Sequence, residues 1–438
     1  MLRYAEMALA AFAIIILTGT NAYYFLLGVP AEIKPEELET YEAVIRNVFL
    51  LSYAIVALLT LLHWQKMLLG IAAVWPVALM VAIAWLSTTW SVDPETTPRR
   101  CIALTITTLM GIYLFVRFDL HDLLKFLVAV FAIIIVGSLV WVVAFPTYGI
   151  HGDAGHAGAW RGIFFHKNAN GRVMVFALAA FIAAWVDGRI NRGLLGILTL
   201  LAIANLLGSS SKTALLACLA LIMGVIATNM MRGAAVRSAL ITLTVFAVVW
   251  HAGLFIFFSY EAILELLGRD PTLTGRTELW AFTIGEGLKR PFTGFGYDAF
   301  WFGDNSPGAR IALEWGISHA HNSWIEVFIN LGLPMIVLLA ITLATGLFRA
   351  VVLARYYPDL TPALFVMVTL LSMMTISMSE AVFLERHTID WIMTVVVLGC
   401  ARAYMSKLSH QSEESAAPLA ESGDEAPPMR RPAHVSPL

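Results

Sequence analysis

Runs of about 20 apolar residues recur along most of the chain, and they constrain its fold more than any other feature. A bilayer core about 30 Å thick needs about that length for one helical span. Charged residues make up 13% of the chain, against roughly 25% in soluble domains. The sequence therefore predicts an all-α polytopic membrane protein. Twelve spans are expected, near residues 5–29, 44–62, 67–86, 101–117, 124–145, 169–187, 193–208, 213–231, 237–259, 322–348, 361–379 and 388–405.

Short loops on one side of these spans carry one or two cations each, which predicts their orientation. The cations are Lys66, Arg117, Lys125, Arg189, Arg192, Arg232, Arg237, Arg349 and Arg355. Positive loops stay in the cytoplasm, so both termini are expected there.

Two loops are expected on the opposite, outward side. The loop 260–321 is long enough to contain short helices of its own, and 146–168 forms a smaller one. Residues 1–405 are thus read as one membrane domain. Residues 406–438 are polar and rich in Pro, Ala, Ser and Glu, which predicts a disordered cytoplasmic tail.

Charge and cysteine content narrow the possible partners. The net charge of −2 implies no nucleic-acid partner. The three cysteines all fall inside predicted spans and are read as small buried hydrophobes. His151, Asp153 and His156, in HGDAGH, match no recognised metal spacing and are read as a solvated loop. The prediction is therefore no metal and no cofactor.

Four outward stretches place cations or histidines at or near expected helix starts. They are AWRGIFFHKNANGR with Arg161, His166, Lys167, Asn168 and Arg172; GSSSKTALL with Lys212; GRTELWAF with Arg276; and SHAHNSW with His319 and His321. A cation at a helix N-terminus opposes the macrodipole by roughly 0.3–1 kcal/mol. Four such placements on one face predict an anionic ligand such as pyrophosphate.

Structural explanations remain open for several of these cations. Arg161, Lys167 and Arg172 would also serve as lipid-headgroup anchors. Stacking on Trp280 would account for Arg276. Lys212 is flanked closely by apolar spans, and an ionisable group in that position is more often functional than structural.

The stretch HNSWIEVFINLG places Gly332 eleven residues after His321. In a continuous helix both would lie on one stripe, about 16 Å apart, and Gly332 would let a neighbouring helix approach. Asn322 is expected to satisfy main-chain groups in the first turn. Glu326 lies about 140° around the helix from His321 and is not paired with it.

These motifs resemble those of the O-antigen ligase and polysaccharide polymerase superfamily. HNSWIEVFINLG is similar to its H-N-x9-G motif, SSSKTALL to its S-[RK]-T/G-x-x-L segment, and GRTELW with KRPFTGFGYDAFW to its R-x-x-x-W and G-x-G-x-x-x-F stretches. STTWSVDPETTPRR also resembles a family feature. The ligase-related core would cover about residues 208–350. RGIFFHKNANGR and Lys212 most resemble exopolysaccharide polymerases of the ExoQ/Wzy type.

The resemblance implies an inverting, metal-independent glycosyltransferase with a GT-C-like fold in the bacterial inner membrane. It would polymerise undecaprenyl-pyrophosphate-linked oligosaccharides on the periplasmic face. His321 would be the general base and Arg276 would stabilise the departing pyrophosphate. Arg161, His166, Lys167, Asn168, Arg172, Lys212, His319 and Asn322 would bind substrate.

Other functions stay open at this point. A ligase would transfer the glycan to a lipid A core instead. A flippase or transporter would place its ionisable groups near the bilayer midplane, whereas here they gather on one face. Polysaccharide chain-length and export proteins are open as partners.

Overall fold

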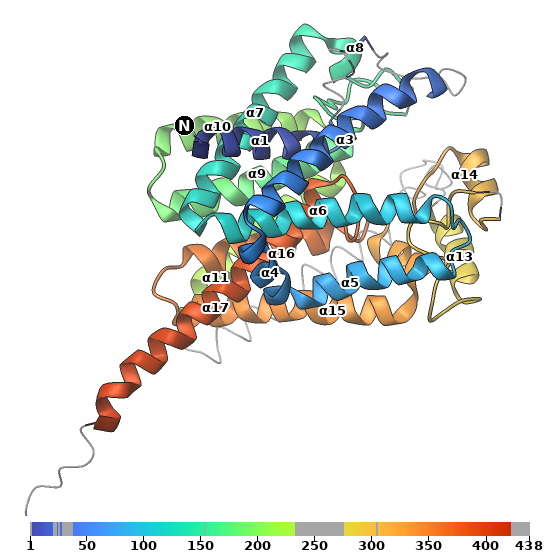
Figure 1. The fold of residues 1–438 in the computed structure, drawn as a ribbon. Coiled ribbons are helices and arrows are strands. Elements are labelled where there is room, and N and C mark those ends of the chain that lie inside the picture. The colour runs from blue at the N-terminus through green and yellow to red at the C-terminus, as the bar shows by residue number, and fades with distance from the viewer. Residues whose placement is uncertain are drawn as a thin grey trace, which may run out of the picture.

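The computed structural model describes residues 2–20, 24, 27–28, 38–153, 155–232, 276–303 and 305–421. Within these ranges the chain is helical, with two isolated β-bridges and no strand. The helices are α1 Leu2–Leu17, α3 Leu38–Leu62, α4 Trp64–Ala73, α5 Trp75–Leu86, η2 Ser87–Thr89, α6 Thr97–Arg117, α7 Leu120–Ala144, α8 Pro146–Gly149, α9 Lys167–Asp187, α10 Arg192–Gly208, α11 Lys212–Met230, α13 Arg276–Gly287, α14 Ala309–Trp315, α15 Ser323–Tyr356, α16 Thr361–Ile376 and α17 Ile389–Glu421 (Figure 1).

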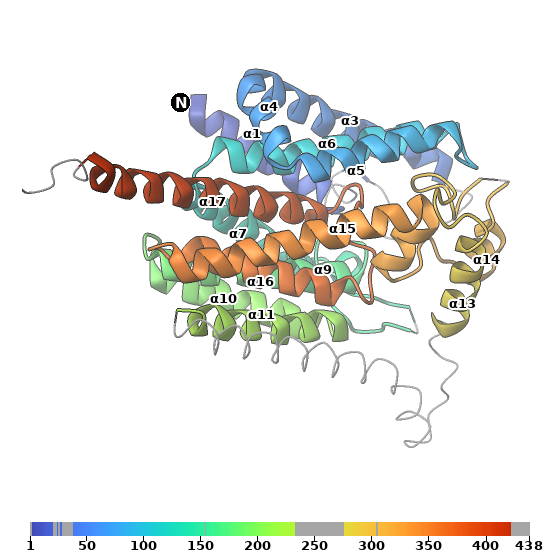
Figure 2. The ribbon, with the colours of Figure 1, turned by 90° about the horizontal axis from the view of Figure 1, so that it is seen from below.

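Helix α16 occupies the centre of the bundle. Its sequence, TPALFVMVTLLSMMTI, is apolar on every side, and a helix of that kind is buried all round. It packs against α9, α11, α15 and α17, and α17 packs in turn against α6 (Figures 1 and 2). The apolar runs therefore assemble into a single all-α bundle, as the sequence predicts.

Seven described helices are long and apolar enough to cross a membrane, and the α4–α5 pair makes an eighth if it counts as one span. They correspond to eight of the twelve predicted spans. The predicted spans 193–208 and 361–379 appear as the shorter apolar helices α10 and α16. The predicted span 237–259 lies outside the described residues, so the full count of twelve stays a prediction.

Two predicted spans differ from the structure for local reasons. The span predicted at 5–29 ends as a helix at Leu17, and Gly19 has a φ of 71°, a left-handed conformation that commonly terminates helices. The span predicted at 67–86 is two helices bent by 93°. Pro76, in the first turn of α5, lacks the N–H that a continuous helix would need.

The C-terminal helix extends further than the sequence predicts. Disorder was expected from residue 406, but α17 continues to Glu421 and projects beyond the bundle (Figure 1). Glu and Ala are good helix formers, so a polar Ser/Glu/Ala-rich segment can continue a helix that the apolar bundle has started. Residues 422–438 lie outside the described ranges.

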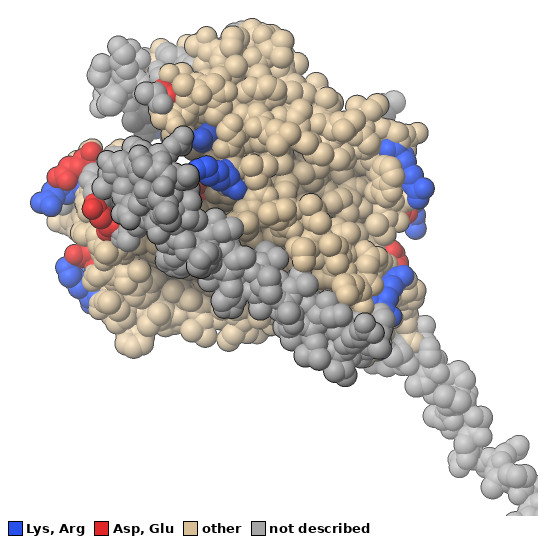
Figure 3. Space-filling view, turned by 180° about the vertical axis from the view of Figure 1, so that it is seen from behind, with Lys and Arg blue, Asp and Glu red and all other residues tan. Residues whose placement is uncertain are grey.

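The two ends of the bundle differ in content. Helices α13 and α14 lie at one end, which we call the loop end, and the N-terminus and the far end of α17 lie at the other (Figures 1 and 2). On the face shown in Figure 3, most charged side chains lie toward these two ends, with a broad uncharged region between them. This arrangement matches a protein whose middle is surrounded by lipid.

Candidate active site

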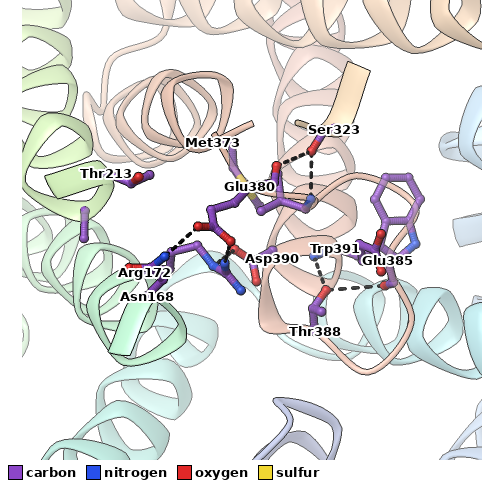
Figure 4. A network of polar contacts seen from close by, with 12 residues as sticks. Asn168, Arg172, Thr213, Ser323, Met373, Glu380, Glu385, Thr388, Asp390 and Trp391 are labelled. Carbon is purple, nitrogen blue, oxygen red and sulfur yellow. Dashed lines mark hydrogen bonds and ion pairs between the residues drawn. The ribbon is translucent and has the colours of Figure 1, made fainter. Parts of the chain in front are cut away.

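Glu380 is a buried carboxylate in the loop 377–388, which joins α16 to α17 at the loop end. Its Oε1 accepts a hydrogen bond from the side chain of Asn168 at 2.7 Å, and its Oε2 accepts one from Arg172 at 3.0 Å. Both donors stand in the first turns of α9 (Figure 4). The Arg172 guanidinium also lies 3.3 Å from the carboxylate of buried Asp390.

Two buried carboxylates therefore pair with the single positive charge of Arg172. A buried charge is tolerated when it is paired and hydrogen-bonded, and removing one partner is strongly destabilising. In this geometry Arg172 holds Glu380 in place, which differs from both the predicted substrate contact and the lipid-anchor alternative.

His319 and His321 face the same site from the turn that precedes α15. Their ring centroids lie 4.0 Å apart. One ring nitrogen of each and one carboxylate oxygen of Glu380 all lie within 4.8 Å of one another. The structure thus joins two residues singled out from the sequence to an acid that the sequence analysis did not identify.

The start of α15 is capped as the sequence predicts, but His321 lies outside the helix. The side-chain oxygen of Asn322 accepts from the N–H groups of Trp324 at 2.9 Å and Ile325 at 3.3 Å, and the helix begins at Ser323. His321 has a φ of 50°, in the left-handed region. A residue there cannot belong to the helix, so the prediction that His321 begins it is wrong.

The same helix start is bound to the loop that carries Glu380. The main-chain N–H of Ser323 donates to the Ser377 carbonyl at 2.9 Å, and its hydroxyl donates to the Glu380 carbonyl at 2.8 Å. The Asn322 amide donates to the Met378 carbonyl at 3.2 Å. These bonds fix the histidine turn and Glu380 relative to each other.

Gly332 has a different role from the one predicted. Its φ of 78° and ψ of 178° interrupt the helix, so it does not continue the stripe of His321. A Cβ at this position would lie 2.4 Å from the main-chain carbon of Phe292. The segment that approaches Gly332 is therefore a loop, and the expectation of a neighbouring helix there is wrong.

Pro334 explains why α15 breaks at this point. It has no N–H, so the Asn330 carbonyl four residues earlier has no donor within the helix. Gly296 supplies that donor at 3.0 Å, and Phe295 donates to the Ile329 carbonyl at 2.8 Å. The loop 291–296 thus satisfies the carbonyls that the break leaves open.

The family-like stretch TGFGYDAFW forms this contact with the help of its two glycines. Gly294 and Gly296 both have positive φ values, of 63° and 103°. A Cβ on Gly294 would lie 2.4 Å from the Asn330 main chain, and one on Gly296 would lie 2.6 Å from Ser91. Ser91 belongs to STTWSVDPETTPRR, so two motifs far apart in sequence pack together beside α15.

Two predicted cations begin helices that converge on the site. Lys167 is the first residue of α9 and Lys212 is the first residue of α11. The hydroxyl of Thr213 is hydrogen-bonded to that of Ser379 at 2.8 Å, which brings the start of α11 beside Glu380. Lys212 is exposed.

Two further predicted cations, Arg161 and Arg276, differ from Lys167 and Lys212 in their surroundings. Arg161 is buried, and its guanidinium donates to the carbonyls of Tyr148 at 2.9 Å and Thr147 at 2.8 Å. It therefore binds the short helix α8, which argues against both its predicted substrate contact and the lipid-anchor alternative. Arg276 is the first residue of α13, and its side chain lies outside the described residues.

The described residues of the HGDAGH segment are mostly exposed, as predicted for a solvated loop, but His151 within it is buried. Asp153 bridges His151 and His156, with nitrogen–oxygen distances of 2.9 and 2.7 Å. The ring of His166 lies 5.2 Å from His151 and 5.1 Å from His156. Burial lowers the pKa of His166 to about 4, and burial with the nearby Arg161 lowers that of His151.

Within the described residues, two groups bring metal-binding side chains close enough to share an ion: His151–Asp153–His156 and His319–His321–Glu380. In each group one imidazole nitrogen already accepts a main-chain N–H. His151 Nε2 accepts from Lys167, and His319 Nδ1 accepts from His321, both at 3.1 Å. A neutral imidazole that accepts at one nitrogen carries its proton on the other. These bonds disfavour His151 and His319 as metal ligands.

Glu380 is not among the residues predicted from the sequence, although the sequence holds a signal for it. The stretch SMSEAVFLERHTID places several ionisable residues between two apolar spans. Such density at the end of a span is unusual and points to function. What the sequence does not show is the partners, since Asn168 lies 212 residues away along the chain.

Comparison with known proteins shows which family the chain resembles. Residues 197–340 match the family described as O-antigen ligase. The chain is also 29% identical over 304 residues to the exopolysaccharide production protein ExoQ of Rhizobium meliloti (strain 1021), covering 66% of this chain and 68% of that protein. The resemblance noted from the motifs is thus confirmed.

Proposed function

Because this chain resembles the O-antigen ligase family and ExoQ, we propose that it polymerises lipid-pyrophosphate-linked oligosaccharide units on the periplasmic face of the inner membrane. The observation that carries the proposal is the convergence of His319, His321 and Glu380 with the starts of α9 and α11. It places a candidate base, a carboxylate and two lysines at one end of an apolar bundle.

The chemistry follows from the groups present. A sugar hydroxyl of the incoming unit attacks the anomeric carbon of the growing chain, and the bond from that carbon to the pyrophosphate oxygen breaks with inversion. His321 takes the hydroxyl proton, and Glu380 stabilises the resulting imidazolium. Lys167, Lys212 and Arg276 stabilise the departing pyrophosphate. No step of this mechanism requires a metal.

We assign the remaining predicted binding residues by their positions. His319 and Asn322 form the wall beside the base, and Asn168 acts through Glu380. His166 caps α9, with its Nδ1 accepting from the Asn168 N–H at 3.2 Å. For Arg161 and Arg172 we propose positioning roles in place of substrate contact, because their guanidinium groups bind Tyr148 and Glu380.

Purified protein in detergent tests the proposal directly. It is expected to lengthen lipid-linked repeat units at the same rate with and without chelator. Transfer to a lipid A core without lengthening would instead make the protein a ligase. Strict dependence on a divalent ion would contradict the metal-free mechanism.

The orientation needs its own test. Single cysteines near residues 150 and 305 should react with a membrane-impermeant thiol reagent in intact spheroplasts, and one near 235 should not. The opposite pattern would place the site in the cytoplasm.

A further inference from the structure

We propose that Glu326 and Trp280 are positioning residues that clamp the main chain of Ala320 and so set the geometry of the His319–His321 pair. The catalytic consequence rests on the function proposed above, whereas the clamp itself is a property of the fold. Glu326 stands in the first turn of α15 and Trp280 stands on α13.

Ala320 separates the two histidines and is held at three points. Its N–H donates to Glu326 Oε2 at 2.8 Å, and its carbonyl accepts from the indole N–H of Trp280 at 2.8 Å. Its methyl group is fully buried in an apolar cluster with Leu279 and Phe328. A residue fixed at N–H, carbonyl and side chain cannot rotate, so the residues on either side keep a defined direction.

Glu326 is itself fixed and almost fully buried. It is 5% exposed, and its carboxylate accepts from the Trp301 indole at 2.9 and 3.2 Å and from the Asn330 amide at 3.0 Å. Trp301 is almost fully buried. Three donors converge on one buried carboxylate, and a group enclosed in this way acts through the turn that it holds.

The clamp gives a purpose to residues that the sequence left unassigned. Trp280 was considered only as a stacking partner of Arg276, yet its N–H is directed to Ala320. Glu326 was set apart from His321 because it lies on another side of the helix, and the structure connects it to Ala320 instead. Trp301 closes the family-like stretch TGFGYDAFW. Two segments therefore bond Ala320 directly, and the third holds Glu326.

Two conservative variants each disrupt one of the two hydrogen bonds that hold the Ala320 main chain. Glu326→Gln keeps the size of the side chain but turns an NH₂ group toward donors, because every described partner of the carboxylate is a donor. Trp280→Phe keeps an aromatic ring and removes the donor to Ala320. Trp85→Phe is the matched control, since it loses one indole hydrogen bond, to Thr105 at 3.0 Å, away from the turn.

The first measurement needs no activity. Hydrogen exchange of the Ala320 amide, followed in purified full-length protein, should accelerate at least tenfold in Glu326→Gln and stay within twofold of the wild type in Trp85→Phe. Unchanged exchange in Glu326→Gln would overturn the clamp, whatever reaction the protein catalyses.

The second measurement is the rate of lengthening of lipid-linked oligosaccharide. Misplacing a catalytic group by about 1 Å can cost about a hundredfold. We expect kcat to fall at least tenfold in Glu326→Gln and Trp280→Phe with KM unchanged, and a double variant to lose no more than the worse single one. Additive losses, or a raised KM with kcat unchanged, would overturn a shared positioning role. A wild-type protein that does not lengthen the substrate would contradict the proposed function alone, because the exchange result stands independently.

Discussion

The helices α9 and α15 begin on opposite sides of Glu380 and are capped by different chemistry. At α15 the amide of Asn322 accepts from the first free N–H groups. At α9 two imidazoles do so, with His151 accepting from Lys167 and His166 accepting from Asn168. An amide cap does not change between pH 4 and 8, whereas an imidazole accepts only while it is neutral.

Glu380 joins these two helix starts through different atoms. Its carboxylate binds Asn168 and Arg172 of α9, and its main-chain carbonyl binds Ser323 of α15. A change at α9 therefore reaches the charged group of Glu380, and a change at α15 reaches the histidine turn. In the proposed mechanism, the α15 side therefore supplies the reacting group and the α9 side fixes the charge beside it.

The largest expected effect tests the α15 side. His321→Ala should insert and fold normally but lose most polymerisation, since general acid–base groups contribute about 10²–10⁴-fold. His319→Ala should lose less, because its proposed role is contact with substrate. Product chain length and size-exclusion profiles would be measured together. An inactive His319→Ala beside a normal His321→Ala would assign the base to His319, and activity in both would remove the base from the mechanism.

The carboxylate between the two sides should have the next largest effect. Glu380→Gln removes the negative charge beside the proposed imidazolium and leaves Arg172 with Asp390 as its partner. It also turns an NH₂ group toward the donors of Asn168 or Arg172, so folded yield should fall as well. Loss of about 1.4 kcal/mol of charge stabilisation corresponds to about a tenfold lower kcat. Steady-state kinetics would show kcat falling and KM nearly constant. Wild-type kcat in this variant would limit Glu380 to a structural role.

Gly332 tests whether the break in α15 is required. Gly332→Ala forces an L-residue to a φ of 78° and puts its Cβ 2.4 Å from the Phe292 main chain. Left-handed strain alone costs about 1–3 kcal/mol, so folded yield and the thermal midpoint should fall. Gly196→Ala, in α10 with no atom near the added Cβ, is the matched control and should not destabilise. Equal stability of the two variants would contradict this account of the break.

The sequence predicts the helical bundle well, because an apolar run of about 20 residues in lipid forms a spanning helix. It predicts the Asn322 cap because a helix cap depends only on neighbouring residues. The prediction that His321 and Gly332 lie on one face of a continuous helix is wrong, because the helix is interrupted at Gly332, two residues before Pro334. The predictions also miss Glu380, whose partners are distant in sequence. Local chemistry is readable from the chain, whereas the partners of buried charges depend on tertiary packing.

The smallest expected effect concerns the caps of α9 and depends on pH. Burial lowers the pKa of His166 to about 4, against about 6.5 for an unfolded histidine. The unfolded state therefore binds the extra proton first, so the stability that this residue contributes is complete above pH 6.5 and is lost as the pH falls toward 4.

His166→Asn replaces the imidazole with the amide cap that α15 uses, which cannot titrate in this range. Nearby Glu380, Arg172, His151 and His156 are the same in both proteins, so their contributions largely cancel. The thermal midpoint of the wild type should fall more steeply between pH 7 and 4.5 than that of the variant. Hydrogen exchange in the first turn of α9 should show the same difference, while the first turn of α15 stays unchanged. Parallel pH curves for the two proteins would mean that protonation of His166 does not loosen α9.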